Sequence, residues 1–162
     1  MPQLILITGG NIGEREKKIA EASKRISQRI GKVLRSSALY ETAAWGNTQQ
    51  ADFLNQVLVV QTSKEPEEIM ELVLKIEKEM GRVRTEKNAP RVIDIDILFY
   101  DKKVCISKDL TIPHPQIQNR RFVLTPLNEL IPQFIHPVLK KSVHQLLLSC
   151  KDPLAVKKRA VV

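Results

Sequence analysis

The sequence predicts an α+β fold in which helices cover one face of an antiparallel sheet. Two segments carry apolar residues at the helical period, and the segments around them show the short apolar or alternating runs of strands. Their order along the chain is strand, helix, strand, strand, helix, strand. With 162 residues, of which 43% are hydrophobic, the chain has the size and apolar content of one domain, residues 1–162.

The first strand is predicted at residues 3–8, where the chain is almost entirely apolar. A helix over about residues 14–30 follows, with apolar positions 19, 22, 26 and 30 on one stripe. Between them, residues 9–13 read Gly-Gly-Asn-Ile-Gly, which we interpret as a turn. The alternative, a phosphate-binding loop, lacks both the Gly-Lys-Ser/Thr ending and the G-x-G-x-x-G spacing.

Two strands, at residues 33–41 and about 53–62, precede the second helix. That helix begins near Pro66, a residue suited to a first turn, and ends at Gly81. A strand over about residues 92–100 completes the β-α-β-β-α-β order of ferredoxin-like sandwiches, which would leave the second sheet face open to ligands. The remaining chain predicts a C-terminal strand/helix extension, with a short strand at 104–106 and helices near 123–130 and 142–149.

Composition narrows the class of protein. No apolar run is long enough to cross a bilayer and no signal-peptide pattern opens the chain, so a soluble, cytoplasmic protein is expected. The net charge of +8 favours an anionic partner, either nucleic acid or a nucleotide. Cys105 and Cys150 show no metal-ligand spacing and are expected to be ordinary thiols.

Asp94 and Asp96 are the most informative residues of the chain. They alternate with Ile93, Ile95 and Ile97, so a strand would place both carboxylates on one face and the isoleucines on the other. Two carboxylates about 7 Å apart can hold a pair of divalent cations. The alternative is a solvated strand face with nothing bound, but aspartate is depleted in strands.

Arginines flank this pair of aspartates. Arg82 and Arg84 follow the second predicted helix, where their only role could be a favourable interaction with the negative end of its dipole. Together with Arg91 they bring three guanidinium groups close to the carboxylates in sequence. Metal-binding carboxylates and arginine forks are the parts of a phosphoryl-transfer site.

A second group of residues suits a flat heterocycle. Trp45, Phe53 and Phe122 could enclose a planar ring whose edge Asn55 would read, although core packing explains each aromatic equally well. His114 stands in the rigid run Thr-Ile-Pro-His-Pro beside the predicted strand region. A lone histidine is more often structural than catalytic, but His114 is the best placed of the three.

These motifs resemble the 6-hydroxymethyl-7,8-dihydropterin pyrophosphokinase family of folate biosynthesis. The resemblance rests on Gly-Arg-Val-Arg at 81–84, Pro-Arg-x-x-Asp-x-Asp at 90–96, Leu-Thr-Ile-Pro-His-Pro at 110–115 and Asn-Arg-Arg-Phe at 119–122. It runs from the first strand to about Pro132. It implies an ATP- and Mg²⁺-dependent transferase of the β,γ-pyrophosphoryl group, acting on the pterin hydroxymethyl group and releasing AMP.

The resemblance also implies roles for individual residues. Asp94 and Asp96 would bind both of two Mg²⁺ ions, and Arg82 and Arg91 would cover the transferred phosphates. The ATP site would comprise Glu77, Arg84, Arg91, Ile97, Thr111, His114 and Arg120. The pterin site would comprise Thr42, Ala43, Trp45, Phe53, Asn55 and Phe122.

The chain departs from the family pattern at several positions. Lys87-Asn88-Ala89 stands where many members have a tryptophan before Gly-Pro-Arg, and Phe53 replaces the usual tyrosine. These changes concern the pterin side rather than the metal chemistry. The expected partners are the two small-molecule substrates, with no nucleic acid or membrane, and the expected state is a monomer.

Two other functions fit part of the sequence. A basic β-α-β-β-α-β domain could bind RNA, but the aromatic strand motif of RNA-recognition domains is missing. A two-metal nuclease or nucleotidyl transferase could use Asp94 and Asp96. It would leave Trp45, Phe53, Asn55 and Phe122 unexplained.

Overall fold

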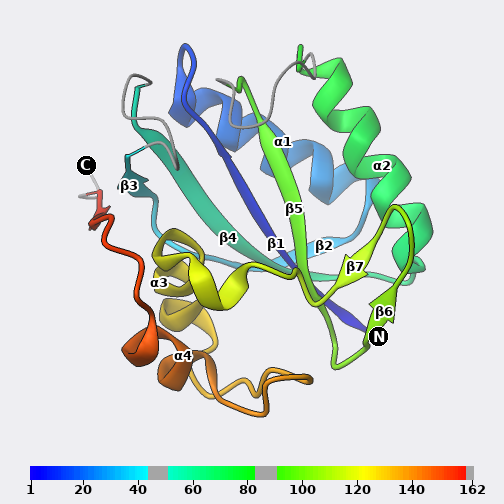
Figure 1. Ribbon diagram of the computed structural model, residues 1–162. Coiled ribbons are helices and arrows are strands. Elements are labelled where there is room, and N and C mark those ends of the chain that lie inside the picture. Colours follow the sequence, from blue (N-terminus) through cyan, green and yellow to red (C-terminus); the bar gives the residue numbers. More distant parts are fainter. Residues whose placement is uncertain (44–50, 83–90, 160–162) are drawn as a thin grey trace.

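The computed structural model describes residues 1–43, 51–82 and 91–159. Within these ranges the chain forms one sheet of six strands in the order β5-β1-β4-β3-β8, with β2 also paired to β4, a separate two-stranded sheet, and four α-helices (Figure 1). Every strand pair of the large sheet is antiparallel. The predicted α+β class and the antiparallel sheet are therefore confirmed.

The elements follow the predicted order. The first half consists of β1 (Gln3–Gly10), α1 (Arg15–Arg29), β2 (Lys32–Ser36), β3 (Tyr40–Thr42), β4 (Phe53–Gln61), α2 (Pro66–Glu79) and β5 (Asp94–Tyr100). The second half consists of β6 (Cys105–Ile106), β7 (Thr111–Ile112), a 3₁₀ turn (Ile117–Asn119), α3 (Arg121–Leu130), α4 (Val143–Ser149) and β8 (Val156–Lys158).

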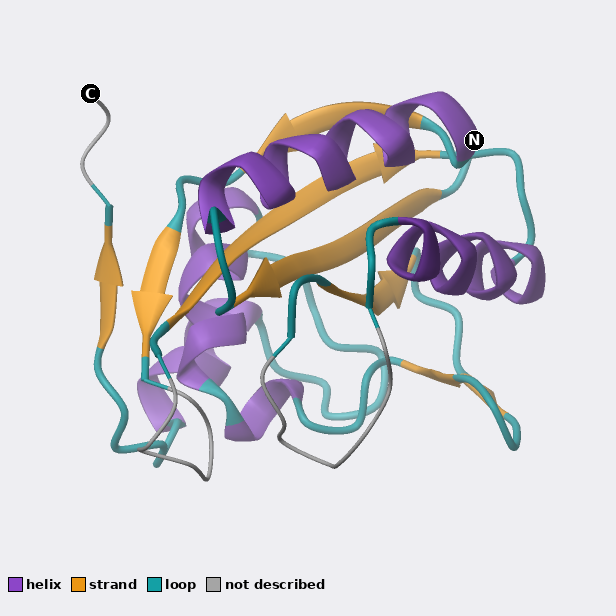
Figure 2. Ribbon diagram, turned by 90° about the horizontal axis from the view of Figure 1, so that it is seen from above, coloured by secondary structure: helices purple, strands orange, loops and turns teal. Residues whose placement is uncertain are grey.

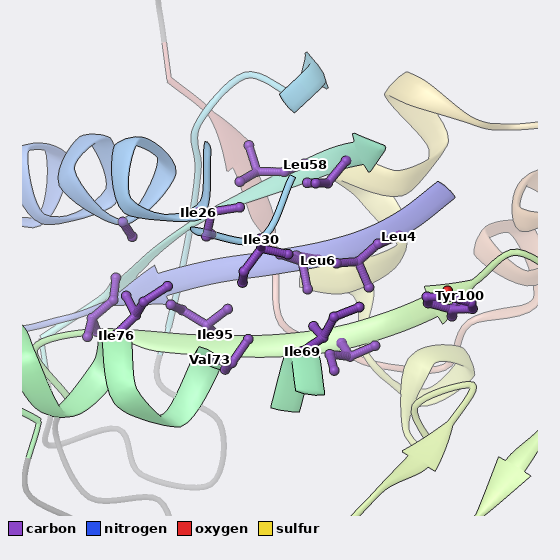
Figure 3. Close-up of a cluster of buried hydrophobic side chains, with 14 of the residues drawn as sticks. Leu4, Leu6, Ile26, Ile30, Leu58, Ile69, Val73, Ile76, Ile95 and Tyr100 are labelled. Atoms are coloured by element: carbon purple, nitrogen blue, oxygen red, sulfur yellow. The ribbon is translucent and has the colours of Figure 1, made fainter. Parts of the chain in front are cut away.

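Helices α1 and α2 cover one face of the sheet (Figure 2). Their apolar stripes pack on strand residues whose side chains point to that face, because side chains alternate along a strand. Figure 3 shows Ile26 and Ile30 at the end of α1 and Ile69, Val73 and Ile76 of α2 gathered over β1, β4 and β5. Ile93, Ile95 and Ile97 belong to this core, as the alternation around Asp94 and Asp96 predicts.

The second sheet face is not open, contrary to the sequence-based expectation. Helices α3 and α4 cover much of it, with Leu124 and Leu127 of α3 and Val143 of α4 fully buried against the strands. The β-α-β-β-α-β pattern could not show this, because these helices come from the chain that follows it. What stays available for ligands is the end of this face that lies beyond α3.

One predicted strand, residues 33–41, is interrupted. Strands β2 and β3 both pair with β4, but the buried Ser37 separates them. The Ser37 hydroxyl accepts the Val57 N–H at 2.9 Å and so replaces a main-chain carbonyl in the ladder. The break leaves β3 as a short strand beside the first residues of β4.

The glycines after residue 8 also differ from the prediction of a turn. Gly9 and Gly10 belong to β1, and of the first three glycines only Gly13 has a positive φ, 69°. A Cβ built on Gly9 would lie 2.0 Å from Asn55 Oδ1, and one on Gly10 would lie 2.4 Å from the Val92 carbonyl oxygen. These two glycines therefore allow neighbouring chain segments to approach β1 closely, and they do not form a turn.

None of the described helices has both the length and the apolar character that crossing a bilayer requires.

The packing of the second face gives a stability prediction. Replacing the fully buried Leu124 with alanine should lower the free energy of unfolding by about 2 to 5 kcal/mol, because it leaves a cavity between α3 and the sheet. Leu148→Ala, at a position 74% exposed on α4, is the matched control and should change it by less than about 0.5 kcal/mol. Urea unfolding followed by circular dichroism measures both, and equal midpoints would contradict this packing.

Candidate active site

Asp94 and Asp96 lie on the sheet face that α3 and α4 partly cover. Asp94 pairs with Gly9 of β1, and Asp96 pairs with Ile7, whose side chain belongs to the core under α3. Leu98, two residues further, is buried in the same core. The strand alternation therefore places both carboxylates on one face, as the sequence predicts.

Two arginines contact Asp94. Arg82 Nη1 lies 2.7 Å from Asp94 Oδ1 and 2.6 Å from Glu77 Oε2, while Arg91 Nη1 lies 3.4 Å from Asp94 Oδ2. The Arg82 side chain is only 9% exposed. Burial alone would lower the pKa of Arg82, but the two carboxylates raise it above its usual value, so the guanidinium stays charged.

Glu77 supports this arrangement from inside the protein. At 2% exposure its carboxylate is not open to a nucleotide, which is the contact that the family resemblance implies. Its Oε2 instead accepts the Ile95 N–H of the edge strand β5 at 2.7 Å in addition to the bond from Arg82. Glu77 therefore ties α2, Arg82 and the aspartate strand together.

The surroundings of Asp96 disfavour its charged form. Burial, together with the negative charges of Asp94 and Glu77, raises the pKa of Asp96 to about 7, and Arg120 and Arg82 only partly offset this. A carboxylate in such surroundings is stabilised by any cation that binds it. Asp96 and Asp94 are thus suited to holding a divalent ion.

The donor set fits Mg²⁺ better than a metal that needs a closed protein cage. Among the described residues, no group of three histidine, cysteine, aspartate or glutamate side chains is arranged to hold a metal ion. Mg²⁺ is usually held by one or two carboxylates, with water and substrate phosphate oxygens as further ligands. Asp94 and Asp96 could supply the two protein ligands.

A cavity of about 240 Å³ opens on the outer side of β5. It brings together the predicted metal ligand Asp96 and three of the residues predicted for ATP binding, Ile97, Thr111 and His114. The sequence analysis did not find its other lining residues, which are Met70, Lys108, Asp109, Leu110 and Pro115. The Lys108-Asp109 pair, separated from the predicted Thr111 by Leu110 alone, is the one signal that could have found part of this set.

His114 is held rigidly in the wall of this cavity. Its N–H donates to the Leu98 carbonyl oxygen at 3.1 Å, and its Nδ1 accepts the Gln116 N–H at 3.1 Å. Burial, with the positive charge of Arg120 nearby, lowers the pKa of His114 to about 4. His114 is therefore neutral at pH 7 and can hydrogen-bond a ligand without adding charge.

The residues predicted for the pterin lie on the other side of Asp94. Asn55 faces Gly9, and Phe53 lies two residues before it on β4, so both point to the same face as the aspartates. Phe122, in the first turn of α3, packs at the margin of the core under that face, and Arg120 lies 5.8 Å from its ring centroid. The structure thus brings Phe53, Asn55 and Phe122 to one side of the sheet.

Of the remaining predicted residues, two lie in the part of the chain that the structure describes and two lie outside it. Thr42 is 4% exposed, and its hydroxyl donates to the Ala155 carbonyl oxygen, so this donor is already used. Ala43 follows β3 directly and is half-buried. Trp45 and Arg84 lie outside the described residues.

Comparison with known proteins identifies the family of the chain. The family model described as 7,8-dihydro-6-hydroxymethylpterin-pyrophosphokinase matches residues 5–132. The chain belongs to this pyrophosphokinase family. Its members transfer a pyrophosphoryl group to hydroxymethyldihydropterin in folate synthesis, and this chain is such a diphosphokinase.

Curated relatives support the family assignment over most of the chain. The 2-amino-4-hydroxy-6-hydroxymethyldihydropteridine pyrophosphokinase of Aquifex aeolicus is 39% identical over 145 residues, which are 90% of this chain and 90% of that protein. The enzyme of the same name from Bacillus subtilis is 39% identical over 77% of this chain and 75% of its own length. The folic acid synthesis protein of Pneumocystis carinii is 42% identical over 83% of the chain, which spans only 18% of that longer protein.

Solved structures show the same fold. The Plasmodium falciparum HPPK-DHPS structure with pteroate superposes with a TM-score of 0.74 at 19% identity. The match covers 91% of this chain and 42% of that one, so the pyrophosphokinase corresponds to part of the longer protein. This likeness concerns the fold alone.

The half-buried His114 gives a pH prediction for the pyrophosphokinase. Between pH 6.5 and about 4 the unfolded chain takes up a proton at this position while the folded chain does not, so stability falls as the pH drops through this range. His114→Gln removes this loss, which should reach on the order of 2 to 3 kcal/mol near pH 4.5. Urea unfolding at pH 7 and 4.5 measures the difference, with His144→Gln at an exposed position as control. An equal acid loss in wild type and His114→Gln would contradict the burial of this ring.

Proposed function

We propose that ATP binds in the cavity beside β5, that the pterin binds over β4, and that the pyrophosphoryl group passes between them at Asp94 and Asp96. The proposal rests on the sequence of residues across neighbouring strands of the sheet. From the edge inward, this sequence consists of the cavity, the two aspartates of β5, Gly9 of β1 and Asn55 of β4. The phosphates of one substrate would therefore meet the hydroxymethyl group of the other above the carboxylates.

Gly9 allows the ATP side and the pterin side of the proposed site to approach each other. Asn55 Oδ1 lies 2.0 Å from where a Cβ of residue 9 would stand, so the carboxamide leans over β1 toward Asp94. A pterin edge bound to Asn55 would extend in the same direction. Phe53 and Phe122 would enclose the ring, with Thr42, Ala43 and Trp45 as further contacts.

On the nucleotide side, Thr111 and His114 would hold ATP from the cavity wall, with Ile97 contacting adenine. Arg120 interacts electrostatically with both Asp94 and Asp96. It would therefore also lie near the ATP phosphates. Arg82, Arg91 and Arg84 would neutralise the transferred pyrophosphoryl group. Glu77 would act indirectly by holding Arg82.

The charge balance implies that the substrates change the arginine contacts. Two Mg²⁺ ions, held by Asp94 and Asp96, would supply positive charge to the phosphates and lower the pKa of the pterin hydroxyl. Arg82 would then exchange its bond to Asp94 for bonds to phosphate oxygens. Asn11 would keep Arg91 in place, since its Oδ1 accepts the Arg91 N–H at 2.9 Å and its Nδ2 donates to the Ala51 carbonyl oxygen at 3.0 Å.

In the reaction, the hydroxymethyl oxygen forms a bond to the β-phosphorus of ATP. The bond between this phosphorus and the oxygen that bridges to the α-phosphorus breaks, and that oxygen leaves with AMP. The hydroxyl proton is released. We further propose that the protein acts as a monomer in the cytoplasm, since the proposed sites for both substrates come from one chain.

The first test is the identity of the products. The purified protein should convert ATP and 6-hydroxymethyl-7,8-dihydropterin to AMP and the pterin diphosphate only when Mg²⁺ is present, which anion-exchange chromatography separates. Asp96→Asn should lower kcat by at least about a hundredfold, because one metal-binding charge is lost. Asp101→Asn, at an exposed position directly after β5 and outside the cavity lining, is the matched control. Release of ADP, or turnover without the pterin, would overturn the proposal.

The second test concerns the contact between β1 and Asn55. Gly9→Ala should weaken pterin binding about tenfold or more, because its methyl group occupies the place of the Asn55 carboxamide. Gly13→Ala is the control: it strains a backbone with φ of 69° but has nothing within 4 Å of the new Cβ. Calorimetric titration with the pterin, in the presence of a non-hydrolysable ATP analogue and Mg²⁺, compares them. Equal pterin affinity in both variants would contradict the role of Gly9.

A further inference from the structure

The segment of residues 150–159 lies beyond the range that the family model matches, yet it contacts two elements of the proposed pterin site. After α4 the chain returns along the molecule to the edge of the large sheet, where β8 lies beside β3 (Figures 1 and 2). Its hydrogen bonds reach the start of α3, which carries Phe122, and β3, which carries Thr42. We refer to residues 150–159 as the C-terminal clamp.

The first anchor of the C-terminal clamp is Asp152, which is 6% exposed. Its Oδ2 accepts the Arg121 N–H at 3.0 Å, and its Oδ1 accepts the Leu154 N–H at 3.0 Å. Arg121 opens α3, and the residue before it provides no side-chain cap. Asp152 therefore caps α3 from a distant part of the chain, where a negative charge also suits the helix dipole.

Arg121 strengthens this first anchor. Its Nε donates to the Asp152 carbonyl oxygen at 3.2 Å, and its Nη2 donates to the Cys150 carbonyl oxygen at 2.9 Å. Main chain and side chain of one residue are thus bound to the same short segment. Phe122 is the next residue of α3.

The second anchor is the strand pair between β8 and β3. Val156 lies opposite Thr42, which in turn lies opposite Phe53 of β4. The buried Thr42 hydroxyl donates to the Ala155 carbonyl oxygen at 3.0 Å. Beyond the strand, the Arg159 N–H donates to the Leu39 carbonyl oxygen at 2.8 Å, and its guanidinium pairs with Glu16 and Glu41.

Only two residues separate Asp152 from Ala155, so the two anchors are joined by about 10 Å of chain at most. We propose that the C-terminal clamp sets the spacing between the Phe53 side and the Phe122 side of the pterin site, with Asp152 as its positioning residue. The inference rests on the proposed function, because it concerns the same pterin site. It assigns to this segment an effect on pterin affinity and not on the nucleotide cavity, which lies at the far edge of the sheet beside β5.

The test compares pterin and nucleotide binding in Asp152 variants. Asp152→Ala should weaken pterin binding about tenfold, since one charged hydrogen-bond acceptor is lost at the helix start. Asp152→Asn, which keeps one acceptor oxygen, should fall between wild type and Asp152→Ala. The Kd of a non-hydrolysable ATP analogue with Mg²⁺ should change less than about threefold. No residue of the clamp lines the cavity, and Asp152 reaches the nucleotide side only through its electrostatic interaction with Arg120. Arg159→Ala tests the second anchor separately: it removes the ion pairs with Glu16 and Glu41, touches no residue proposed to contact the pterin, and should weaken pterin binding a few-fold.

Two controls separate positioning from general loss of stability. Lys151→Ala alters an exposed neighbour of Asp152 and should bind both ligands as wild type does. Leu146→Ala removes core packing in α4 and should lower the melting temperature without selective loss of pterin binding. An equal loss of both ligands in Asp152→Ala, or a pterin loss in Leu146→Ala as large as in Asp152→Ala, would overturn the proposal.

Hydrogen exchange distinguishes a failure of the C-terminal clamp from a failure of the proposed function. Asp152→Ala should speed exchange at residues 40–42 and 121–124 without any ligand present. Unchanged protection there would overturn the clamp even if the wild-type protein binds pterin. Absence of pterin binding by the wild type, with the exchange effect present, would count against the proposed function instead.

Discussion

Two carboxylates on a largely covered sheet face are the constraint on which the site depends. Burial and the charges of Asp94 and Glu77 disfavour the charged form of Asp96, and the protein supplies positive charge around the two aspartates from Arg82, Arg91 and Arg120. Glu77 is buried behind them and holds both Arg82 and β5. A site balanced in this way can exchange arginine contacts for metal ions and phosphates without a large change in net charge.

The glycines of β1 set the distance between β5 and the Asn55 side chain of β4, and so between the two proposed substrate sites. β1 lies between β5 and β4, so a side chain at position 9 would separate Asp94 from Asn55. Glycine leaves that space to the Asn55 carboxamide, and Gly10 lets the chain at Val92 approach β1. Chemistry between two bound molecules needs reacting atoms about 3 Å apart, and this close packing of backbone makes such an approach possible.

The second half of the chain both completes the core and carries residues of the proposed site. Helices α3 and α4 complete the core over the face that carries the site, while the turn before α3 and its first residues bring Arg120 and Phe122 to the margin of that core. The same chain then returns to β3 and caps α3 through Asp152. The element that closes the sheet edge is thus also attached to both sides of the proposed pterin site, which protects an exposed edge as well.

Much of the fold and of the candidate site follows from the sequence alone. Local periodicity is sufficient to predict both long helices, the main strands and the separation of Asp94 and Asp96 from the isoleucines, because side-chain direction depends only on the local backbone. Motif spacing is sufficient to single out the arginines, His114 and Asn55. The tertiary structure decided the rest: the interruption at Ser37, the covering of the second sheet face, the burial of Glu77 and the capping of α3 by Asp152. These features depend on strand register and on contacts between residues far apart in sequence, which local patterns do not encode.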